Sequence, residues 1–209
     1  MKLILIGKGN AGKSAFRFLK NIKKSKILKF SRKLKKKNIE KRCFLIDLSN
    51  RKNLNTILKK SYEKKTKIIL GTTGYNKKDI NKIKTFSKKN PIFICANFNF
   101  FFWKFLNIIK YAKKVLPKKR TSILEKHNLN KKDCPSGSSK ILTKILKPVS
   151  LNSVRYSNTI GIHEVFFYDK KNELLLKHKC KKRSNMFKTL PKFLLFLRKK
   201  KKGLFIYPN

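Results

Sequence analysis

Three glycines and a lysine–serine pair near the start of the chain, in the stretch GKGNAGKS, have the spacing of a phosphate-binding turn. Gly7, Gly9 and Gly12 form G-x-G-x-x-G, the fingerprint of a turn that binds the pyrophosphate of a dinucleotide. Gly7 and Gly12, followed by Lys13 and Ser14, also form G-x-x-x-x-G-K-S, the phosphate loop of nucleoside triphosphatases. Both motifs bring backbone N–H groups to an anion at a helix start. The stretch therefore predicts a phosphate site without deciding between a redox cofactor and ATP or GTP.

The elements around this turn fit both motifs. The apolar run 2–6 predicts a strand, and the apolar spacing in 13–22 predicts a helix. Asp47 ends the next strand-like run, where an acid can bond a ribose hydroxyl or lie near magnesium. It stands 47 − 12 = 35 residues after Gly12, more than the roughly 20 expected for a ribose-binding acid. The excess is the lysine-rich stretch 23–37, interpreted as a longer helix and loop, so both alternatives stay open.

A second polar stretch, EKHNLNKKDCPSGSSK at 125–140, brings proton-transfer and anion-binding groups into one loop. His127 can donate or accept a proton near neutral pH, and Lys131 adds positive charge beside it. PSGSS opens a helix, whose N–H groups and hydroxyls can bind a carboxylate. The alternative is that Ser136 only caps the helix and that His127 is an ordinary loop histidine. The combination indicates a small anionic substrate that meets a nucleotide cofactor across a domain cleft.

Apolar runs of strand length alternate with amphipathic stretches in the first half of the chain, at 2–6, 43–47, 67–71 and 92–96. This alternation predicts a parallel sheet covered by helices, in which ligands bind at the carboxyl ends of the strands. In the second half, 162–168 and 173–180 predict a hairpin of antiparallel strands. We therefore expect an α/β fold, with a Rossmann-like parallel-sheet domain and a second α+β domain that has a mixed or antiparallel sheet.

The segment 100–117 predicts a helix that ends at Pro117. Its lysines and aromatic residues also fit a nucleic-acid or membrane element, but a core helix is favoured. The apolar face expected in the core consists of Phe101, Phe105, Ile108, Ala112 and Val115.

Charge is the unusual feature of the composition, because 57 Lys and Arg stand against 9 Asp and Glu and give a formal net charge of +48. Such a field attracts nucleic acid and other polyanions. The lysines are nevertheless spread along the whole chain, and no recognition motif accompanies them. Lysine, asparagine, isoleucine and phenylalanine all have AT-rich codons, so mutational drift explains the composition equally well. No specific nucleic-acid partner is expected.

The four cysteines form no C-x-x-C pair, and two of them lie in apolar runs where buried thiols are common. This pattern favours a reduced compartment over a disulfide framework. The sequence shows no signal peptide and no apolar segment of the ~20 residues that a bilayer requires. We expect a cytoplasmic chain without a membrane partner.

The second polar stretch also resembles a known family. The pattern E-x-H-x-x-x-K-x-D-x-P-S-G at 125–137 is similar to the signature of dihydrodipicolinate reductases (4-hydroxy-tetrahydrodipicolinate reductases). Other segments follow the order of that family and extend the resemblance from about residue 2 to residue 207. They are the glycine turn, GTTGY at 71–75, ANFNF at 96–100, GIHEVFF, ELLLKHKCKKR and the closing GLF.

The resemblance implies an oxidoreductase that reduces 4-hydroxy-tetrahydrodipicolinate to tetrahydrodipicolinate, with loss of water, in lysine and diaminopimelate biosynthesis. It implies NADH or NADPH as cofactor and no metal. His127 would donate the proton, assisted by Lys131, while Asn128, Gly137 and Ser138 would bind the substrate dicarboxylate.

The resemblance also implies a cofactor site, in which the glycine turn holds the pyrophosphate, Asp47 faces the adenosine ribose, and the segments that begin at Gly71 and Cys95 lie near the nicotinamide. Asp47 would favour NADH, whereas Arg51 and Lys52 offset its charge, so the cofactor preference stays open. The full set of expected cofactor-binding residues is Gly7, Lys8, Gly9, Asn10, Ala11, Gly12, Asp47, Gly71, Thr72, Thr73, Cys95, Ala96, Asn97 and Phe98.

We expect a dinucleotide-binding domain at 1–98, to which 183–209 return, and a substrate-binding and oligomerisation domain at 99–182. By resemblance the second domain would build a homotetramer. Two other functions compete with this interpretation. A phosphate-loop NTPase or kinase would leave the 125–140 stretch unexplained, and a nucleic-acid-binding protein would depend on charge alone.

The chain departs from the family pattern at three positions. Asn128 stands where a second histidine is usual, and Ser138 replaces the usual threonine but keeps the hydroxyl. Ser157 stands where a glycine is common. An uncharged Asn128 can still hydrogen-bond a carboxylate, so these changes bear on the level of activity more than on its type.

Overall fold

The computed structural model of the chain describes residues 1–22, 26–31, 43–64 and 66–207. It divides into two compact units. The first unit comprises Met1–Phe98 and Phe187–Asn209, and the second comprises Asn99–Met186. The sequence analysis expected the return to the first unit at residue 183, four residues earlier.

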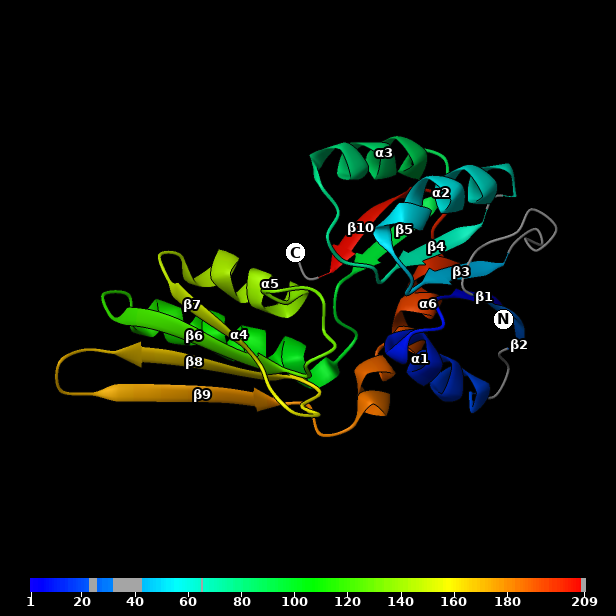
Figure 1. Cartoon of the computed structure of the whole chain (residues 1–209). Helices are drawn as coiled ribbons and strands as arrows, with labels where there is room; N and C mark the ends of the chain where they lie inside the picture. Colours follow the sequence, from blue (N-terminus) through cyan, green and yellow to red (C-terminus); the bar gives the residue numbers. More distant parts are fainter. Residues whose placement is uncertain (23–25, 32–42, 65, 208–209) are drawn as a thin grey trace. The chain divides into compact units, whose positions relative to one another are not determined.

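The first unit is built on a parallel sheet of six strands in the order β10-β5-β4-β3-β1-β2 (Figure 1). The strands are β1 (Lys2–Ile6), β2 (Lys26–Ser31), β3 (Phe44–Asp47), β4 (Lys67–Leu70), β5 (Pro91–Cys95) and β10 (Gly203–Tyr207). Helices cover both faces: α2 and α3 lie on one, and α1 and α6 on the other (Figure 1). They are α1 (Asn10–Lys20), α2 (Leu54–Glu63), α3 (Lys77–Ser87) and α6 (Leu190–Arg198).

The alternation of side chains along the strands explains this layering. Ile4 and Ile6 of β1 belong to the apolar cluster formed with α2 and α3, which includes Ile57 and Ile83. On the other face, the Phe93 ring of β5 packs on α6, with its centroid 4.6 Å from that of Phe193. Strands buried on both faces are continuous apolar runs, as in KLILI and PIFIC.

The strand β2 was not expected from the sequence. The stretch 23–37 was interpreted as helix and loop, but Lys26–Ser31 pairs with β1 at the edge of the sheet. The Phe30 ring stacks on Phe16 of α1 at 4.5 Å between centroids, while lysines are tolerated at a sheet edge because they stay solvated. The remaining residues of that stretch, 23–25 and 32–37, lie outside the described residues.

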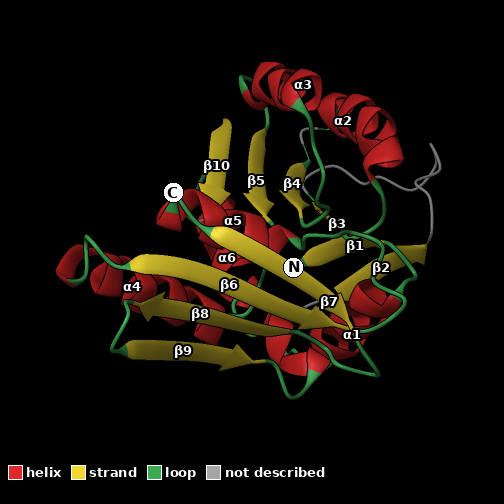
Figure 2. Ribbon diagram, turned by 60° about the vertical axis from the view of Figure 1, so that its left-hand side comes forward, coloured by secondary structure: helices red, strands yellow, loops and turns green. Residues whose placement is uncertain are grey.

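The second unit has a mixed sheet of four strands in the order β7-β6-β8-β9, in which only β6 and β7 are parallel (Figure 2). Its strands are β6 (Arg120–His127), β7 (Ser150–Arg155), β8 (Ile162–Tyr168) and β9 (Glu173–Lys179). Its helices are α4 (Phe100–Val115) and α5 (Gly137–Leu146). The expected fold class, a Rossmann-like domain with a second α+β domain, is confirmed.

Helix α4 forms where it was expected, but its buried face is different. Phe101 is 71% exposed, and Ile108 and Val115 are also exposed, so their assignment to the core was wrong. The buried positions are Phe102, Trp103, Phe105, Leu106, Ile109 and Ala112. Apolar residues surround this helix on most sides, and the packing of Phe102 against the sheet selects the face.

Ser157, in the turn after β7, has a φ of +47°, the one positive value among the described residues other than glycine. A side chain costs about 1–2 kcal/mol in this conformation, part of which the lost chain entropy of a glycine cancels. Ser157→Gly is therefore expected to raise the free energy of unfolding by about 0.5–1 kcal/mol in urea titrations. Ser150→Gly, in the extended strand β7, is the matched control and should lower it by a similar amount. Destabilisation by both variants would contradict this prediction.

Candidate functional site

In the glycine turn between β1 and α1, the protein's own backbone leaves no room for a side chain at Gly7 and Gly12. Gly7 has a φ of +117°, and a Cβ there would lie 2.3 Å from the Leu48 carbonyl oxygen. A Cβ at Gly12 would lie 1.6 Å from the Gly7 carbonyl oxygen, so this glycine lets the helix pack against the turn. A Cβ at Gly9 would meet nothing within 4 Å. Open space at the second glycine is what a closely approaching pyrophosphate requires.

The start of α1 decides between the two overlapping motifs. The helix begins at Asn10 with Gly9 as its N-cap, and no side chain caps it. Lys13 is already in the helix, since its N–H donates to the Gly9 carbonyl at 2.9 Å. A phosphate loop needs an extended loop up to its lysine, so this conformation excludes it. The N–H groups of the first helical turn are available to a dinucleotide pyrophosphate, and the residues fit the cofactor that a Rossmann turn binds.

Asp47 does not lie where a ribose-binding acid is needed. It ends β3, on the opposite side of β1 from β2, and its side chain is 0% exposed. Its carboxylate accepts hydrogen bonds from the Ser49 N–H at 3.1 Å, from the Ser49 hydroxyl and from the Thr72 hydroxyl at 2.8 Å. Burial raises the pKa of Asp47, and these hydrogen bonds oppose that rise. The assignment of Asp47 to the ribose was therefore wrong, and this residue joins the ends of β3 and β4.

The ends of β4 and β5 also meet at the carboxyl edge of the sheet. Gly71 N–H donates to the Asp47 carbonyl at 2.8 Å, and a Cβ on Gly71 would come within 2.7 Å of the Phe98 ring. Thr73, next to Thr72 in this segment, is half-buried. The segment GTTG therefore lies at the edge where ligands of such sheets bind.

The segment Cys95–Phe98 offers backbone groups more than side chains. Cys95 is fully buried, and its thiol donates to the Asn97 carbonyl at 3.0 Å. Phe98 is buried against Phe187, with ring centroids 5.7 Å apart. Burial raises the pKa of Cys95, so this thiol is inert. Of the expected cofactor contacts here, the half-buried Ala96 is the most accessible.

In the second unit, the buried carboxylate of Glu125 on β6 organises the predicted loop. It accepts hydrogen bonds from the Ser136 N–H at 3.0 Å, from the Ser139 hydroxyl, and from the Arg155 guanidinium at 3.2 Å. Burial would raise the pKa of Glu125, but the bonds from Ser136 and Ser139, with His127 nearby, outweigh it and lower the pKa to about 2. An ionised Glu125 thus fixes the start of α5 to the strand that carries His127.

His127 ends β6 with its side chain 6% exposed. Its Nδ1 lies 3.5 Å from Glu125 Oε2, and its ring centroid lies 5.3 Å from that of His163 on β8. Burial lowers the pKa of His127 to about 4; the Glu125 carboxylate opposes this shift, and Lys131 and Arg155 add to it. His127 is therefore neutral at pH 7 in the absence of a bound anion.

Lys131, Asp133 and Gly137 meet at the start of α5. The Lys131 ammonium pairs with the Asp133 carboxylate, which the Gly137 backbone also hydrogen-bonds. Burial would raise the pKa of Asp133, but these bonds outweigh it and lower the pKa. Ser138 is buried beside Gly137, and Asn128 is half-buried directly after β6. The loop therefore already holds one carboxylate between an ammonium and a helix start.

Arg155 belongs to this network, and the sequence analysis missed it. Besides Glu125, its guanidinium donates to the backbone carbonyls of Lys131, at 3.2 Å, and of Asp133. It thereby holds the loop that carries Lys131. The sequence contains 57 lysines and arginines, and nothing in its pattern distinguishes Arg155 from the others.

Glu125, His127 and His163 each offer a metal-ligand atom, and these atoms lie within 4.8 Å of one another. Both oxygens of Glu125 already accept hydrogen bonds, and the cations of Lys131 and Arg155 face the same group. A bound cation would have to displace those partners, so hydrogen bonds hold this cluster together.

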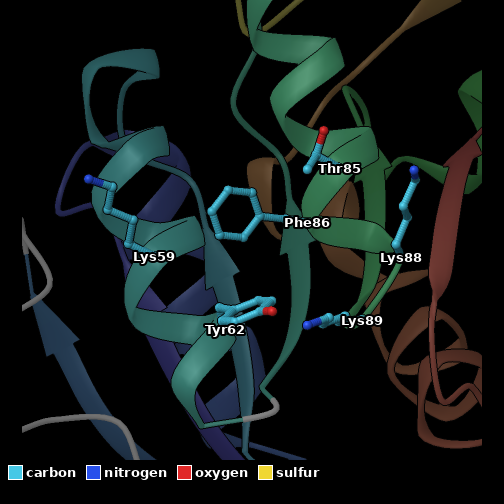
Figure 3. A pocket seen from close by; sticks show the side chains of 6 residues that line it. All are labelled: Lys59, Tyr62, Thr85, Phe86, Lys88 and Lys89. Atoms are coloured by element: carbon cyan, nitrogen blue, oxygen red, sulfur yellow. The ribbon is translucent and has the colours of Figure 1, made fainter.

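A groove of about 520 Å³ lies between α2 and α3 of the first unit. Figure 3 shows its residues, which are Lys59, Tyr62, Thr85, Phe86, Lys88 and Lys89. They come from the carboxyl ends of the two helices, where cations interact favourably with the helix dipole. In a parallel sheet these ends lie away from the carboxyl ends of the strands. The groove therefore shares no residue with the candidate site.

Comparisons with known proteins match both units of the chain to one family. Residues 8–98 match the family description "Dihydrodipicolinate reductase, N-terminus", and residues 104–207 match "Dihydrodipicolinate reductase, C-terminus". The chain belongs to the dihydrodipicolinate reductase family. This family consists of NAD(P)H-dependent oxidoreductases of lysine and diaminopimelate biosynthesis, so the phosphate-loop alternative is set aside.

Individual relatives of this reductase family cover most of the chain. A 4-hydroxy-tetrahydrodipicolinate reductase of Buchnera aphidicola subsp. Cinara cedri is 32% identical over 90% of this chain and 78% of its own length. One from Wigglesworthia glossinidia brevipalpis is 31% identical over 77% of this chain and 64% of its own length. A solved dihydrodipicolinate reductase from Paenisporosarcina sp. TG-14, with dipicolinate bound, has a TM-score of 0.73 at 14% identity, covering 99% of this chain and 97% of that one. The last likeness shows the shared fold.

A substitution at Gly9 tests the cofactor site of this reductase. Because a Cβ at Gly9 has open space and an ordinary φ of −73°, Gly9→Ala should leave the stability of the apo protein within about 0.5 kcal/mol. The methyl group would occupy the space that the pyrophosphate needs, so the Kd for NAD(P)H should rise at least about tenfold, measured by calorimetry. Lys13→Ala, at an exposed position of the same helix, is the control and should leave Kd nearly unchanged. A larger loss of NAD(P)H affinity in Lys13→Ala than in Gly9→Ala would contradict the close approach of the pyrophosphate to Gly9.

Proposed function

We propose that this chain reduces 4-hydroxy-tetrahydrodipicolinate to tetrahydrodipicolinate, with loss of water, using NADH or NADPH. The observation that carries the proposal is the Glu125 network, which ties His127 to the start of α5 and, through Arg155, fixes the loop of Lys131. A proton-transfer group, an ammonium and a helix start are thereby held together in one unit. This set suits a small substrate with two carboxylates.

His127 is proposed as the proton donor and Lys131 as its cationic partner. When bound, NAD(P)H supplies the hydride that reduces the substrate. His127 is neutral in the free protein because burial lowers its pKa to about 4. A dianionic substrate would bring negative charge to this site and raise the pKa of His127, so substrate binding would favour the protonated imidazolium. The ionised Glu125 at 3.5 Å stabilises the resulting imidazolium.

The substrate carboxylates are assigned to Asn128, Gly137 and Ser138. The Asp133 carboxylate contacts both the Lys131 ammonium and the Gly137 backbone, and so marks a position that accepts a carboxylate. A substrate carboxylate would use the same N–H groups at the start of α5. Asn128 contributes a hydrogen bond without charge, which predicts a modest KM penalty relative to a cationic side chain.

The decisive experiment measures loss of dihydronicotinamide absorbance with freshly generated 4-hydroxy-tetrahydrodipicolinate. Substrate-dependent oxidation, with tetrahydrodipicolinate identified as the product, is expected from the folded protein. Omission of substrate, and its replacement by dipicolinate, are the controls. A folded protein that binds NAD(P)H but oxidises none with this substrate would overturn the proposed reaction.

A homotetramer built through the second unit is also part of the proposal. The outer strands β7 and β9 carry exposed apolar side chains, at Val154 and at Leu174 and Leu175. Association of copies through such patches would bury them. The mass in light scattering is expected to be four times that of the chain, and Leu175→Asp should reduce it. An unchanged monomer mass for the wild type would contradict the tetramer.

A cytoplasmic location completes the proposal. All four cysteines are free thiols, which fits a reducing compartment. Within the described ranges, no helix has both the length and the apolar character that crossing a bilayer requires.

A further inference from the structure

The last residue of β2, Ser31, occupies the position that governs recognition of the adenosine ribose. In Rossmann sheets the acid that bonds the ribose 2′-hydroxyl follows the strand beside β1, roughly 20 residues after the glycine motif. Here β2 lies beside β1 on the side opposite β3, and Ser31 stands 31 − 12 = 19 residues after Gly12. The Gly7 N–H donates to the Ser31 carbonyl at 2.8 Å, so Ser31 is fixed against the glycine turn.

The charge around this position is positive. Lys8, in the glycine turn, is exposed, and its ammonium lies 5.7 Å from the centroid of the Phe30 ring, next to Ser31. Phe30 in turn stacks on Phe16, which holds the ring in place under the ammonium. Lys8 therefore places a cation beside the end of β2.

The described carboxylates of the first unit lie elsewhere. Asp47 is buried at the end of β3 and bonded by Ser49 and Thr72, and Asp79 of α3 pairs with Arg51. Among the described residues of this unit, no carboxylate therefore stands at the end of β2.

We propose that the chain selects NADPH over NADH, with the Ser31 hydroxyl and the Lys8 ammonium recognising the 2′-phosphate. A carboxylate at position 31 would accept hydrogen bonds from the two ribose hydroxyls of NADH and would repel the 2′-phosphate of NADPH. The Ser31 hydroxyl can instead donate a hydrogen bond to that phosphate. The inference rests on the proposed function for its use of a nicotinamide cofactor. It goes beyond that function because it assigns the discriminating residues.

Nucleotide fragments test this inference without turnover. Calorimetry at about 0.15 M salt compares 2′,5′-ADP with 5′-AMP, and NADPH with NADH. The ligand with the 2′-phosphate is expected to bind at least about tenfold more tightly in each pair. Since the chain carries a net charge of +48, any extra phosphate gains non-specific affinity. The control is 3′,5′-ADP, which has the same charge with its phosphate on the neighbouring carbon and should bind at least several-fold more weakly than 2′,5′-ADP.

Variants then assign the residues. Ser31→Glu should reverse the preference, while Ser31→Ala and Lys8→Ala should each reduce the NADPH advantage over NADH several-fold. Lys13→Ala removes one exposed charge from α1, directly after the glycine turn, and should leave the ratio of the two affinities as it is.

Equal binding of 2′,5′-ADP and 3′,5′-ADP, or tighter binding of NADH than NADPH, would overturn the inference while the cofactor site stands. Failure of every dinucleotide to bind would remove the cofactor site and the inference together. NADPH binding with the expected ratio, but no reduction of 4-hydroxy-tetrahydrodipicolinate, would support the inference and remove only the proposed substrate.

Discussion

His127→Gln is expected to lower kcat by about 10²–10⁴-fold, the contribution usual for a positioned proton donor, while KM changes by a smaller factor. Glutamine keeps a hydrogen-bonding group at the end of β6 but cannot carry the proton. Steady-state kinetics at saturating cofactor measure the effect. Asn130→Ala, at an exposed position of the same loop, is the matched control and should retain near-wild-type kcat.

The pH dependence distinguishes proton donation by His127 from a merely structural role. The kcat/KM profile reports the free protein, in which burial lowers the pKa of His127 to about 4, and the kcat profile reports the substrate complex. Because the bound dianion raises this pKa, the fall of kcat with rising pH should lie at higher pH than the fall of kcat/KM. Both descending limbs should vanish in His127→Gln. If they persist in the variant, the proton comes from another group, with Lys131 as the first candidate.

The sequence predicted the parts of the fold that depend on strong local patterns. The glycine turn was located because its three glycines have the spacing that a close backbone approach requires, and Gly7 and Gly12 have no room for a side chain. Strands of the first unit were found because burial on both faces makes them continuous apolar runs. The strand β2 was missed because lysines break its apolar pattern at the sheet edge. Because β2 was missed, the strand that ends at Asp47 was interpreted as the strand after the glycine turn, and Asp47 was assigned to the ribose.

The sequence located the loop of the second site but not the contacts that hold it. His127 and Lys131 were singled out by residue type and spacing, and their roles remain proposals. Arg155 and His163 reach the site from other strands, and this proximity arises only from the pairing of β6 with β7 and β8. The buried face of α4 was misplaced for a related reason: apolar residues surround that helix, so tertiary packing chooses the face.

We expect the free energy of unfolding of the second unit to fall steeply in mild acid, because all three histidines of the chain are buried in this unit. Burial lowers the pKa of His127 to about 4 and, with the nearby His127 and His178, that of His163 to about 3. Burial also lowers the pKa of His178. The unfolded chain takes up these protons below about pH 6.5, whereas the folded unit does not. The stability from neutral burial is therefore complete above pH 6.5 and is lost as the pH falls towards the folded pKa values.

The size of the effect follows from proton linkage. Each histidine that is protonated only in the unfolded state costs about 1.4 kcal/mol of stability per pH unit, so His127 and His163 together give a slope of about 3 kcal/mol per unit near pH 5. His178 acts with the same sign. Between pH 6.5 and pH 5 this slope removes about 4 kcal/mol, a large share of the roughly 5–15 kcal/mol of stability that a domain has in total. Urea titrations between pH 8 and pH 5, with the tertiary signal of Trp103 in α4 as the probe of this unit, measure the slope.

His163→Phe is the variant that isolates one of these protons. Neither ring nitrogen of His163 has a hydrogen-bond partner among the described residues, and the ring already packs against Phe102 with centroids 5.3 Å apart. An apolar ring of similar shape should therefore keep the stability at pH 8 and reduce the slope by about 1.4 kcal/mol per pH unit. Phe167→Leu, in the core on the same strand, should lower the stability equally at all pH values and keep the slope. If the stability of the wild type does not change from pH 8 to pH 5, the histidines accept protons in the folded state, which contradicts this prediction. A hydrated or anion-filled site would allow that protonation, and a dry site would not.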